Sequence, residues 1–151
     1  MTTFIEILKQ KEGEALLLGQ LKSAYEATPK VEQKAMLHAD DDYAFRFACN
    51  RGHQEIAKWL MGLCQTTKEK KAMLHARDNW AFRLACENGH IETAKWLWSL
   101  CQTSKEQNAM LHVDNDDDDY DAFCEACEYG HQDVAEWLWN VCPNDQKPEM
   151  L

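Results

Sequence analysis

The sequence predicts an all-α repeat solenoid with short fingers and an N-terminal helical cap. Three observations support this prediction: one motif occurs three times, each copy has helical periodicity, and no segment alternates apolar and polar residues as a strand would. The chain has 151 residues, of which 45% are hydrophobic and three are proline, and this composition is typical of a folded protein. We therefore expect one domain over residues 1–151.

The repeated motif sets the organisation of the chain. The copies AFRFACNRGHQEIAKWL, AFRLACENGHIETAKWL and AFCEACEYGHQDVAEWL begin at Ala44, Ala81 and Ala122. A second block, AMLH, begins at residues 35, 72 and 109, and the last interval between motif copies is four residues longer than the first. We expect an N-terminal cap over 1–37 and repeats over 38–74, 75–111 and 112–151, the last including a C-terminal cap.

Each repeat is expected to contain two antiparallel helices and a short additional helix. The first helix should end at the glycine of the motif, because glycine is the usual left-handed stop. The second helix carries a broad apolar face over residues 54–64 in the first copy. The polar stretch that follows should start the additional helix, where Ser104 with Gln107 fits a capping box. Residues 1–37 add two amphipathic segments, Phe4–Lys11 and Glu14–Ala27, separated at Gly13.

The blocks Tyr43–His53, Trp80–His90 and Asp121–His131 resemble the first helix of ankyrin repeats, whose signature is T-P-L-H-x-A followed by a Gly-His turn. The signature alanine corresponds to Ala48, Ala85 and Ala126. The T-P-L-H tetrapeptide itself is replaced, and the period exceeds the usual value of about 33 residues. The resemblance implies a non-enzymatic protein–protein interaction module that binds its partner on the concave face formed by fingers and first helices.

The expected contact residues change between copies while the framework stays fixed. Such variation at framework-flanking positions is what a recognition surface requires. In and beside the fingers they are Asp40, Asp42, Arg77, Asn79, Trp80, Asp116, Asp117 and Asp118, and before the turn glycines they are Asn50, Arg51, Glu87, Asn88, Glu128 and Tyr129.

The charge is unevenly distributed along the chain. The net charge is −10, whereas residues 44–80 hold seven basic and three acidic side chains. Residues 81–151 hold four basic and fifteen acidic side chains, so one end of the stack should be strongly negative. This favours a partner protein with a basic surface and disfavours nucleic acid, because a duplex-binding protein must neutralise phosphates.

Several features bear on location. No apolar run approaches the roughly 20 residues of a membrane span, and the N-terminal residues mix charges with apolar side chains, unlike a secretory signal. Seven cysteines, six of them at two repeat positions, predict buried thiols in a reducing compartment. The divergent units also resemble ankyrin proteins of amoeba-associated bacteria and large viruses, which implies a cytoplasmic protein, or a host-directed effector acting in a host cell.

Two alternatives from other classes stay open. Asp114, Asp116, Asp118 and Glu125 occupy positions 1, 3, 5 and 12 of a calcium-loop pattern, although Asp119 stands where glycine is required, so the acidic loop Asp114–Glu125 could belong to a calcium or metal sensor. A separate pattern, C-x-x-C-x-x-x-H, could build a zinc or hydrolase site on one helix. It consists of Cys124, Cys127 and His131, and a fourth ligand would have to come from His112. We expect neither a metal nor a cofactor to be resident.

The tryptophans at one repeat position are expected to form a stacked ladder. Trp59, Trp96 and Trp137 all lie in the second helix of their repeat. Repeat stacks must bury their seams, and large aromatic rings do so with much apolar area. Trp80 lies instead at the base of a finger, where an exposed ring could anchor a partner.

Overall fold

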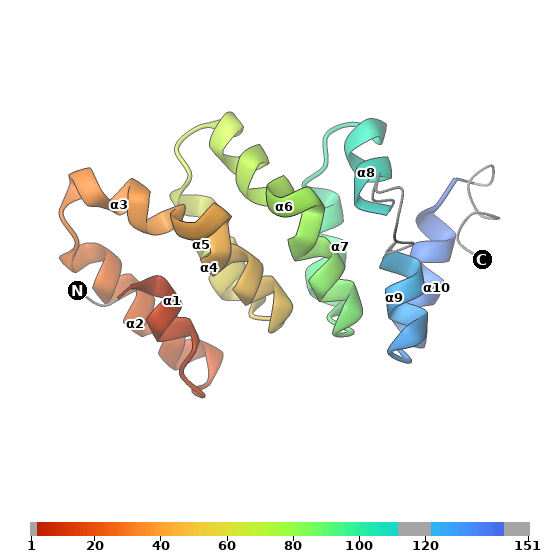
Figure 1. Ribbon diagram of the computed structural model, residues 1–151, viewed down its shortest axis with the longest axis horizontal. Coiled ribbons are helices and arrows are strands. Elements are labelled where there is room, and N and C mark those ends of the chain that lie inside the picture. The colour runs from red at the N-terminus through yellow and green to blue at the C-terminus, as the bar shows by residue number, and fades with distance from the viewer. Residues whose placement is uncertain (1–2, 112–121, 144–151) are drawn as a thin grey trace.

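The computed structural model describes residues 3–111 and 122–143, and every regular element in those residues is a helix. The helices form a single row of stacked units (Figure 1). This arrangement confirms the all-α solenoid that the repeats predict. In chain order the helices are α1 (Phe4–Leu8), α2 (Glu14–Ala27), α3 (Lys30–Leu37), α4 (Ala39–Asn50), α5 (Gln54–Leu63), α6 (Thr67–Glu87), α7 (Ile91–Ser99), α8 (Ser104–Leu111), α9 (Ala122–Glu128) and α10 (Gln132–Val141).

The N-terminal cap consists of α1, α2 and α3. Thr3 and Glu6 form a reciprocal capping box that starts α1, and a glycine at position 13 precedes α2 as expected. The apolar residues Phe4, Leu17 and Leu21 are almost fully buried, so the cap shares the core of the repeats.

Each repeat then contributes a first and a second helix. The pairs are α4 with α5, the second part of α6 with α7, and α9 with α10, and they lie side by side along the row (Figure 1). The turns between them contain Gly52, Gly89 and Gly130 at φ of 71°, 76° and 77°, a left-handed conformation that suits glycine. The additional short helices are α3, the first part of α6, and α8, which lie along one edge of the row.

The start of the additional helices differs by one residue from the expectation. Thr103 rather than Ser104 caps α8, because its hydroxyl accepts from the Glu106 amide at 3.1 Å. The Glu106 carboxylate accepts in turn from the amides of Gln102 and Thr103. Thr66 and Glu69 form the corresponding contact before the first part of α6. The acidic residue, rather than a glutamine, completes the box.

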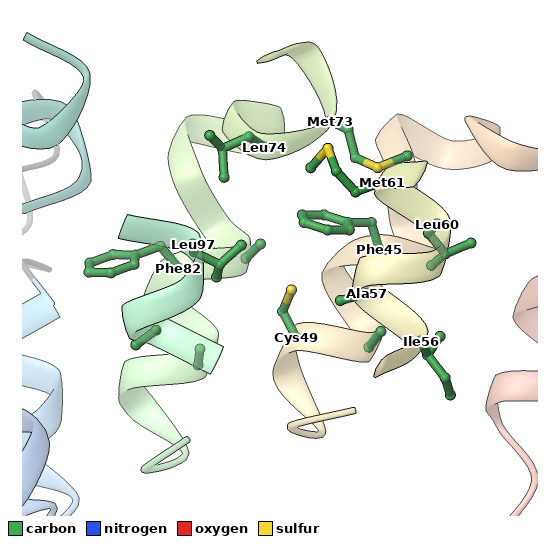
Figure 2. Close-up of a cluster of buried hydrophobic side chains, with 14 of the residues drawn as sticks. Phe45, Cys49, Ile56, Ala57, Leu60, Met61, Met73, Leu74, Phe82 and Leu97 are labelled. Carbon is green, nitrogen blue, oxygen red and sulfur yellow. The ribbon is translucent and has the colours of Figure 1, made fainter. Parts of the chain in front are cut away.

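The core is continuous across the repeats. Figure 2 shows the Phe45 ring beside Met61 and Met73, pointing towards the next repeat, and the Phe82 ring pointing away from it in the same direction along the row. Both phenylalanine side chains are fully buried. Each phenylalanine therefore belongs to the boundary between two units as well as to its own unit.

The repeated tryptophans are half-buried and join neighbouring units. Trp96 packs on Phe45 of the preceding repeat with ring centroids 6.2 Å apart, and Trp137 packs on Phe82 at the same distance. Trp59 makes the equivalent contact with Phe4 of the cap at 5.7 Å. The ladder thus consists of tryptophan–phenylalanine pairs, with each tryptophan contacting the unit before its own.

Candidate functional site

The fingers are three-residue turns in the left-handed conformation. Asp40, Asp41 and Asp42 have φ between 55° and 59°, and Arg77, Asp78 and Asn79 have φ between 55° and 62°. Such backbone costs roughly 1–2 kcal/mol per L-residue, and aspartate and asparagine tolerate it best. The acidic and amide residues at these positions therefore have a local structural reason.

A histidine hydrogen bond closes each finger. His38 Nδ1 donates to Asp42 Oδ1 at 2.5 Å, and His75 Nδ1 donates to Asn79 Oδ1 at 2.5 Å. Asn79 also donates to the carbonyl of Ala109 in the next unit at 3.3 Å. Asp42 and Asn79 are only 7% and 6% exposed. Both were expected to contact a partner, but their side chains face the protein, so we remove them from the contact set.

Arg46 supports the first finger from below. Its Nε donates to the carbonyl of Asp41 at 3.0 Å and its Nη2 donates to the carbonyl of Asp40 at 2.9 Å. The guanidinium lies 5.4 Å from the centre of the Tyr43 ring and 5.5 Å from that of Trp80, distances typical of cation–π contacts. Burial and the nearby Arg77 lower the pKa of this guanidinium. Arg46 therefore connects the first finger with the first helix of the second repeat.

The exposed tips of the fingers pair with each other. Arg77 Nε donates to Asp41 Oδ2 at 3.0 Å, and both side chains are more than half exposed. Farther along the first helices, Asn88 Nδ2 donates to Asn50 Oδ1 at 2.7 Å, and Arg51 lies over the Phe47 ring. We call this exposed side of α4, the second part of α6 and α9 the first-helix face.

A hollow of about 380 Å³ lies on this face between the second part of α6 and α9. Its lining combines two aromatic rings with one basic and three acidic side chains. Trp80 and Tyr129 are 39% and 56% exposed, and they are two of the four large exposed hydrophobic residues in the part of the chain that the structure describes. The lining residues are Trp80, Arg83, Glu87, Glu125, Glu128 and Tyr129.

The electrostatics of the hollow are negative. Three carboxylates stand against one guanidinium, that of Arg83, which lies 6.0 Å from the Trp80 ring centre. Glu87 first, and then Glu128, raise the pKa of the Tyr129 hydroxyl, because both carboxylates disfavour a phenolate beside them. A cation would therefore be attracted to this hollow.

Four of the expected contact residues meet in the hollow, namely Trp80, Glu87, Glu128 and Tyr129. Arg83 and Glu125 were not expected there. The register offered a signal for Glu125, because its position holds Phe47 in the first repeat and Leu84 in the second. A nearly buried acid in place of an apolar residue indicates a function other than core packing. Asp116, Asp117 and Asp118 lie outside the described residues, as do Asp114 and Asp119 of the calcium-loop pattern.

The candidate metal ligands separate into two groups. Cys124 and His131 are half-buried and Cys127 is exposed. Among residues 3–111 and 122–143, the donor atoms that approach within 4.8 Å of one another belong to a different set, in the first repeat: His38, Cys64 and Glu69.

Comparison with known proteins supports the interpretation of the repeats. The family model for ankyrin repeats, in three copies, matches residues 45–147. Neither the curated proteins nor the solved structures give a match to this chain. In the described parts of the chain, the search for a helix of sufficient length and apolar character to cross a membrane gives none. Since the family match extends over more than half of the chain and coincides with the stacked helix pairs, the chain belongs to the ankyrin-repeat family, whose repeats indicate a protein–protein interaction module.

Proposed function

We propose that this protein has a non-enzymatic role and recognises a partner protein through the first-helix face, where the hollow between α6 and α9 receives a basic side chain. The observation that supports this most directly is the composition of the hollow, in which the exposed rings of Trp80 and Tyr129 adjoin three glutamates. Aromatic rings are enriched among the residues that dominate binding energy at protein interfaces.

A lysine or arginine side chain of the partner fits this chemistry. Its charge pairs with the carboxylates of Glu87 and Glu128, while its aliphatic stem covers the aromatic rings. The net charge of −10 acts in the same direction at longer range, because it attracts a basic surface and repels nucleic acid and anionic membranes. The exposed finger residues Asp40 and Arg77 and the exposed Arg51 and Asn88 extend the proposed contact along the face.

The calcium or metal sensor built on the acidic loop receives less support. Glu125, the twelfth position of that pattern, lies in α9 and lines the hollow. A calcium loop would need this carboxylate for the ion, whereas the hollow uses it as part of its wall. We therefore assign Glu125 to partner recognition.

We extend the proposal to the place of action. The resemblance to ankyrin proteins of amoeba-associated bacteria and large viruses favours a host-directed effector or regulator that acts in a cytoplasm. The cysteines fit a reducing compartment, since burial raises the pKa of the Cys64 and Cys101 thiols to about 11 and keeps them unreactive.

Charge reversal in the hollow tests the binding proposal. We expect Glu87→Lys with Glu128→Lys to weaken capture of the partner at least about tenfold, because a like charge would meet the partner's basic side chain. The matched control is Glu92→Lys with Glu136→Lys on the exposed surface of the second helices, which changes the net charge equally. Binding can be compared by affinity capture with quantitative mass spectrometry, followed by interferometry on the recovered partner. Equal losses in both double variants would contradict a specific role for the hollow.

The acidic insertion should act on the association rate. Changing Asp116, Asp117 and Asp118 to serine removes three charges from one end of the chain. We expect slower association with a basic partner and a weaker dependence of that rate on salt, with little change in the dissociation rate. Surface plasmon resonance at two salt concentrations measures both rates. Wild-type association at low salt would show that the insertion does not steer the partner.

A further inference from the structure

A second cluster of chemically versatile side chains lies away from the first-helix face. It forms where the end of α3, the end of α5 and the start of α6 meet, and it comprises His38, Cys64 and Glu69. The ligand atoms of these three side chains lie within 4.8 Å of one another. Three different donor types thus come together from segments up to 31 residues apart.

His38 is held between two carboxylates. Its Nδ1 donates to Asp42 at 2.5 Å, so its Nε2 is the nitrogen that faces Glu69 Oε2 at 3.4 Å. With the ring proton on Nδ1, the lone pair of Nε2 points at a negatively charged oxygen. This arrangement is stabilised only by a positive charge between the two atoms, which is either a second ring proton or a metal ion.

The donor set favours zinc as that positive charge. We infer that His38, Cys64 and Glu69 bind one Zn²⁺ ion, with a fourth position open to water. Imidazole nitrogen, thiolate sulfur and carboxylate oxygen are the three zinc ligands used by proteins, and donors on one tetrahedral zinc stand roughly 3.5 Å apart. The histidine–glutamate separation of 3.4 Å already meets this spacing. A movement of about 1 Å by the thiol brings Cys64 to the same spacing.

Asp42 supplies the outer partner that zinc-binding histidines require. A carboxylate on the far ring nitrogen fixes the tautomer and increases the basicity of the metal-binding nitrogen. Glu69 is oriented in turn by Lys34, whose Nζ lies 3.2 Å from the other carboxylate oxygen. The side chains of His38 and Glu69 keep 22% and 16% of their surface exposed, which leaves an ion a way in from solvent.

The second repeat provides a comparison inside the same chain. His75, Cys101 and Glu106 occupy the same register positions, 37 residues later. Two differences make this set a poorer site. Asn79 replaces the carboxylate of Asp42, and the Glu106 carboxylate lies 3.8 Å from the histidine nitrogen.

The two glutamates also differ in how they cap the following helix. Glu106 Oε2 accepts from the Gln102 amide at 2.5 Å, so this oxygen is committed to capping α8. Glu69 Oε2 accepts from the Gln65 amide at 3.4 Å, a long and weak contact. In the first repeat the oxygen is therefore balanced between the cap and His38, and it is available to an ion.

Cobalt binding to the full chain tests the assignment. After removal of metal with a chelator, we expect one equivalent of Co²⁺ to bind with a thiolate-to-metal charge-transfer band and to be displaced by Zn²⁺. Cys64→Ser should abolish the band, whereas the matched change Cys101→Ser should leave it intact. Circular dichroism of both variants shows whether the fold is retained.

A second variant keeps the test independent of any damage caused by losing the buried thiol. Asp42→Asn gives the first repeat the outer residue of the second, and Asn79 shows that this backbone accepts asparagine. We expect zinc affinity, measured by competition with a chromophoric chelator, to fall about 10–100-fold. An unchanged affinity would overturn the role of Asp42.

Two outcomes would overturn the site itself. One is that Co²⁺ gives no thiolate band with the folded wild-type chain, which would mean that a ring proton supplies the positive charge. The other is that the band survives Cys64→Ser and disappears in Cys127→Ser, which would move the metal to the helix that carries Cys124, Cys127 and His131. The site does not overlap the proposed partner surface, so either result leaves the proposed function untouched.

Discussion

Replacing Phe82 by alanine is expected to lower the free energy of unfolding by about 3–5 kcal/mol, the range for truncating a fully buried aromatic residue. The Phe82 ring is completely shielded from solvent and lies 6.2 Å from the rings of both Trp98 and Trp137. Trp98 belongs to the same repeat and Trp137 to the next, so one substitution weakens two interfaces. Chemical denaturation followed by tryptophan fluorescence measures the loss.

The register of the repeats supplies the control for this prediction. Phe123 is the equivalent residue of the third repeat, but it is half-buried and its ring packs on Trp139 of its own repeat. We expect Phe123→Ala to cost roughly half as much, since less area is uncovered and no neighbouring tryptophan loses its partner. Equal costs for the two substitutions would show that the contact between repeats contributes little to stability.

The parts of this fold that could be predicted are those that recur. Three copies of one motif fixed the number of repeats, and the turn glycines fixed where the first helices end, because a left-handed residue stops a helix wherever it falls. The additional helix before each finger was also predictable, although its cap lies at Thr103 rather than Ser104. Both residues can cap a helix, and only the position of Glu106 distinguishes them.

The finger conformation could not be predicted in the same way. Asp40–Asp42 and Arg77–Asn79 are polar and short, as exposed loops are, and the sequence contains no glycine to announce a left-handed turn. The structure resolves this through hydrogen bonds from His38 and His75, which bury the last residue of each finger. Variation between Asp42 and Asn79 therefore reflects two acceptors for one donor rather than contact with a partner.

The hollow and the zinc cluster were hidden for a different reason. Both depend on side chains brought together from different repeats or from different helices, and a single sequence gives no measure of those distances. Trp80 and Tyr129 stand out as exposed only when the stacking of α6 against α9 is known. Glu69 looks like an ordinary capping residue until His38 is seen 3.4 Å from its carboxylate.

The second large effect on stability is expected at the boundary between the second and third repeats. Gly89 has φ of 76°, and an added Cβ would lie 2.5 Å from Nδ1 of the His131 ring. Gly89→Ala should therefore lower the free energy of unfolding by about 2–4 kcal/mol, which combines left-handed strain with displacement of the ring. Thermal and chemical unfolding followed by circular dichroism measure this loss.

Gly130 separates the two contributions. It has nearly the same conformation, with φ of 77°, but an added Cβ meets nothing within 4 Å among the described residues. Gly130→Ala should thus cost only the left-handed strain, about 1 kcal/mol. The difference between the two variants measures how tightly the histidine of one repeat packs on the glycine turn of the repeat before it, a contact that Gly52 and His90 repeat one unit earlier. If Gly89→Ala and Gly130→Ala destabilise the protein equally, the ring moves aside freely and this contact does not hold neighbouring repeats together.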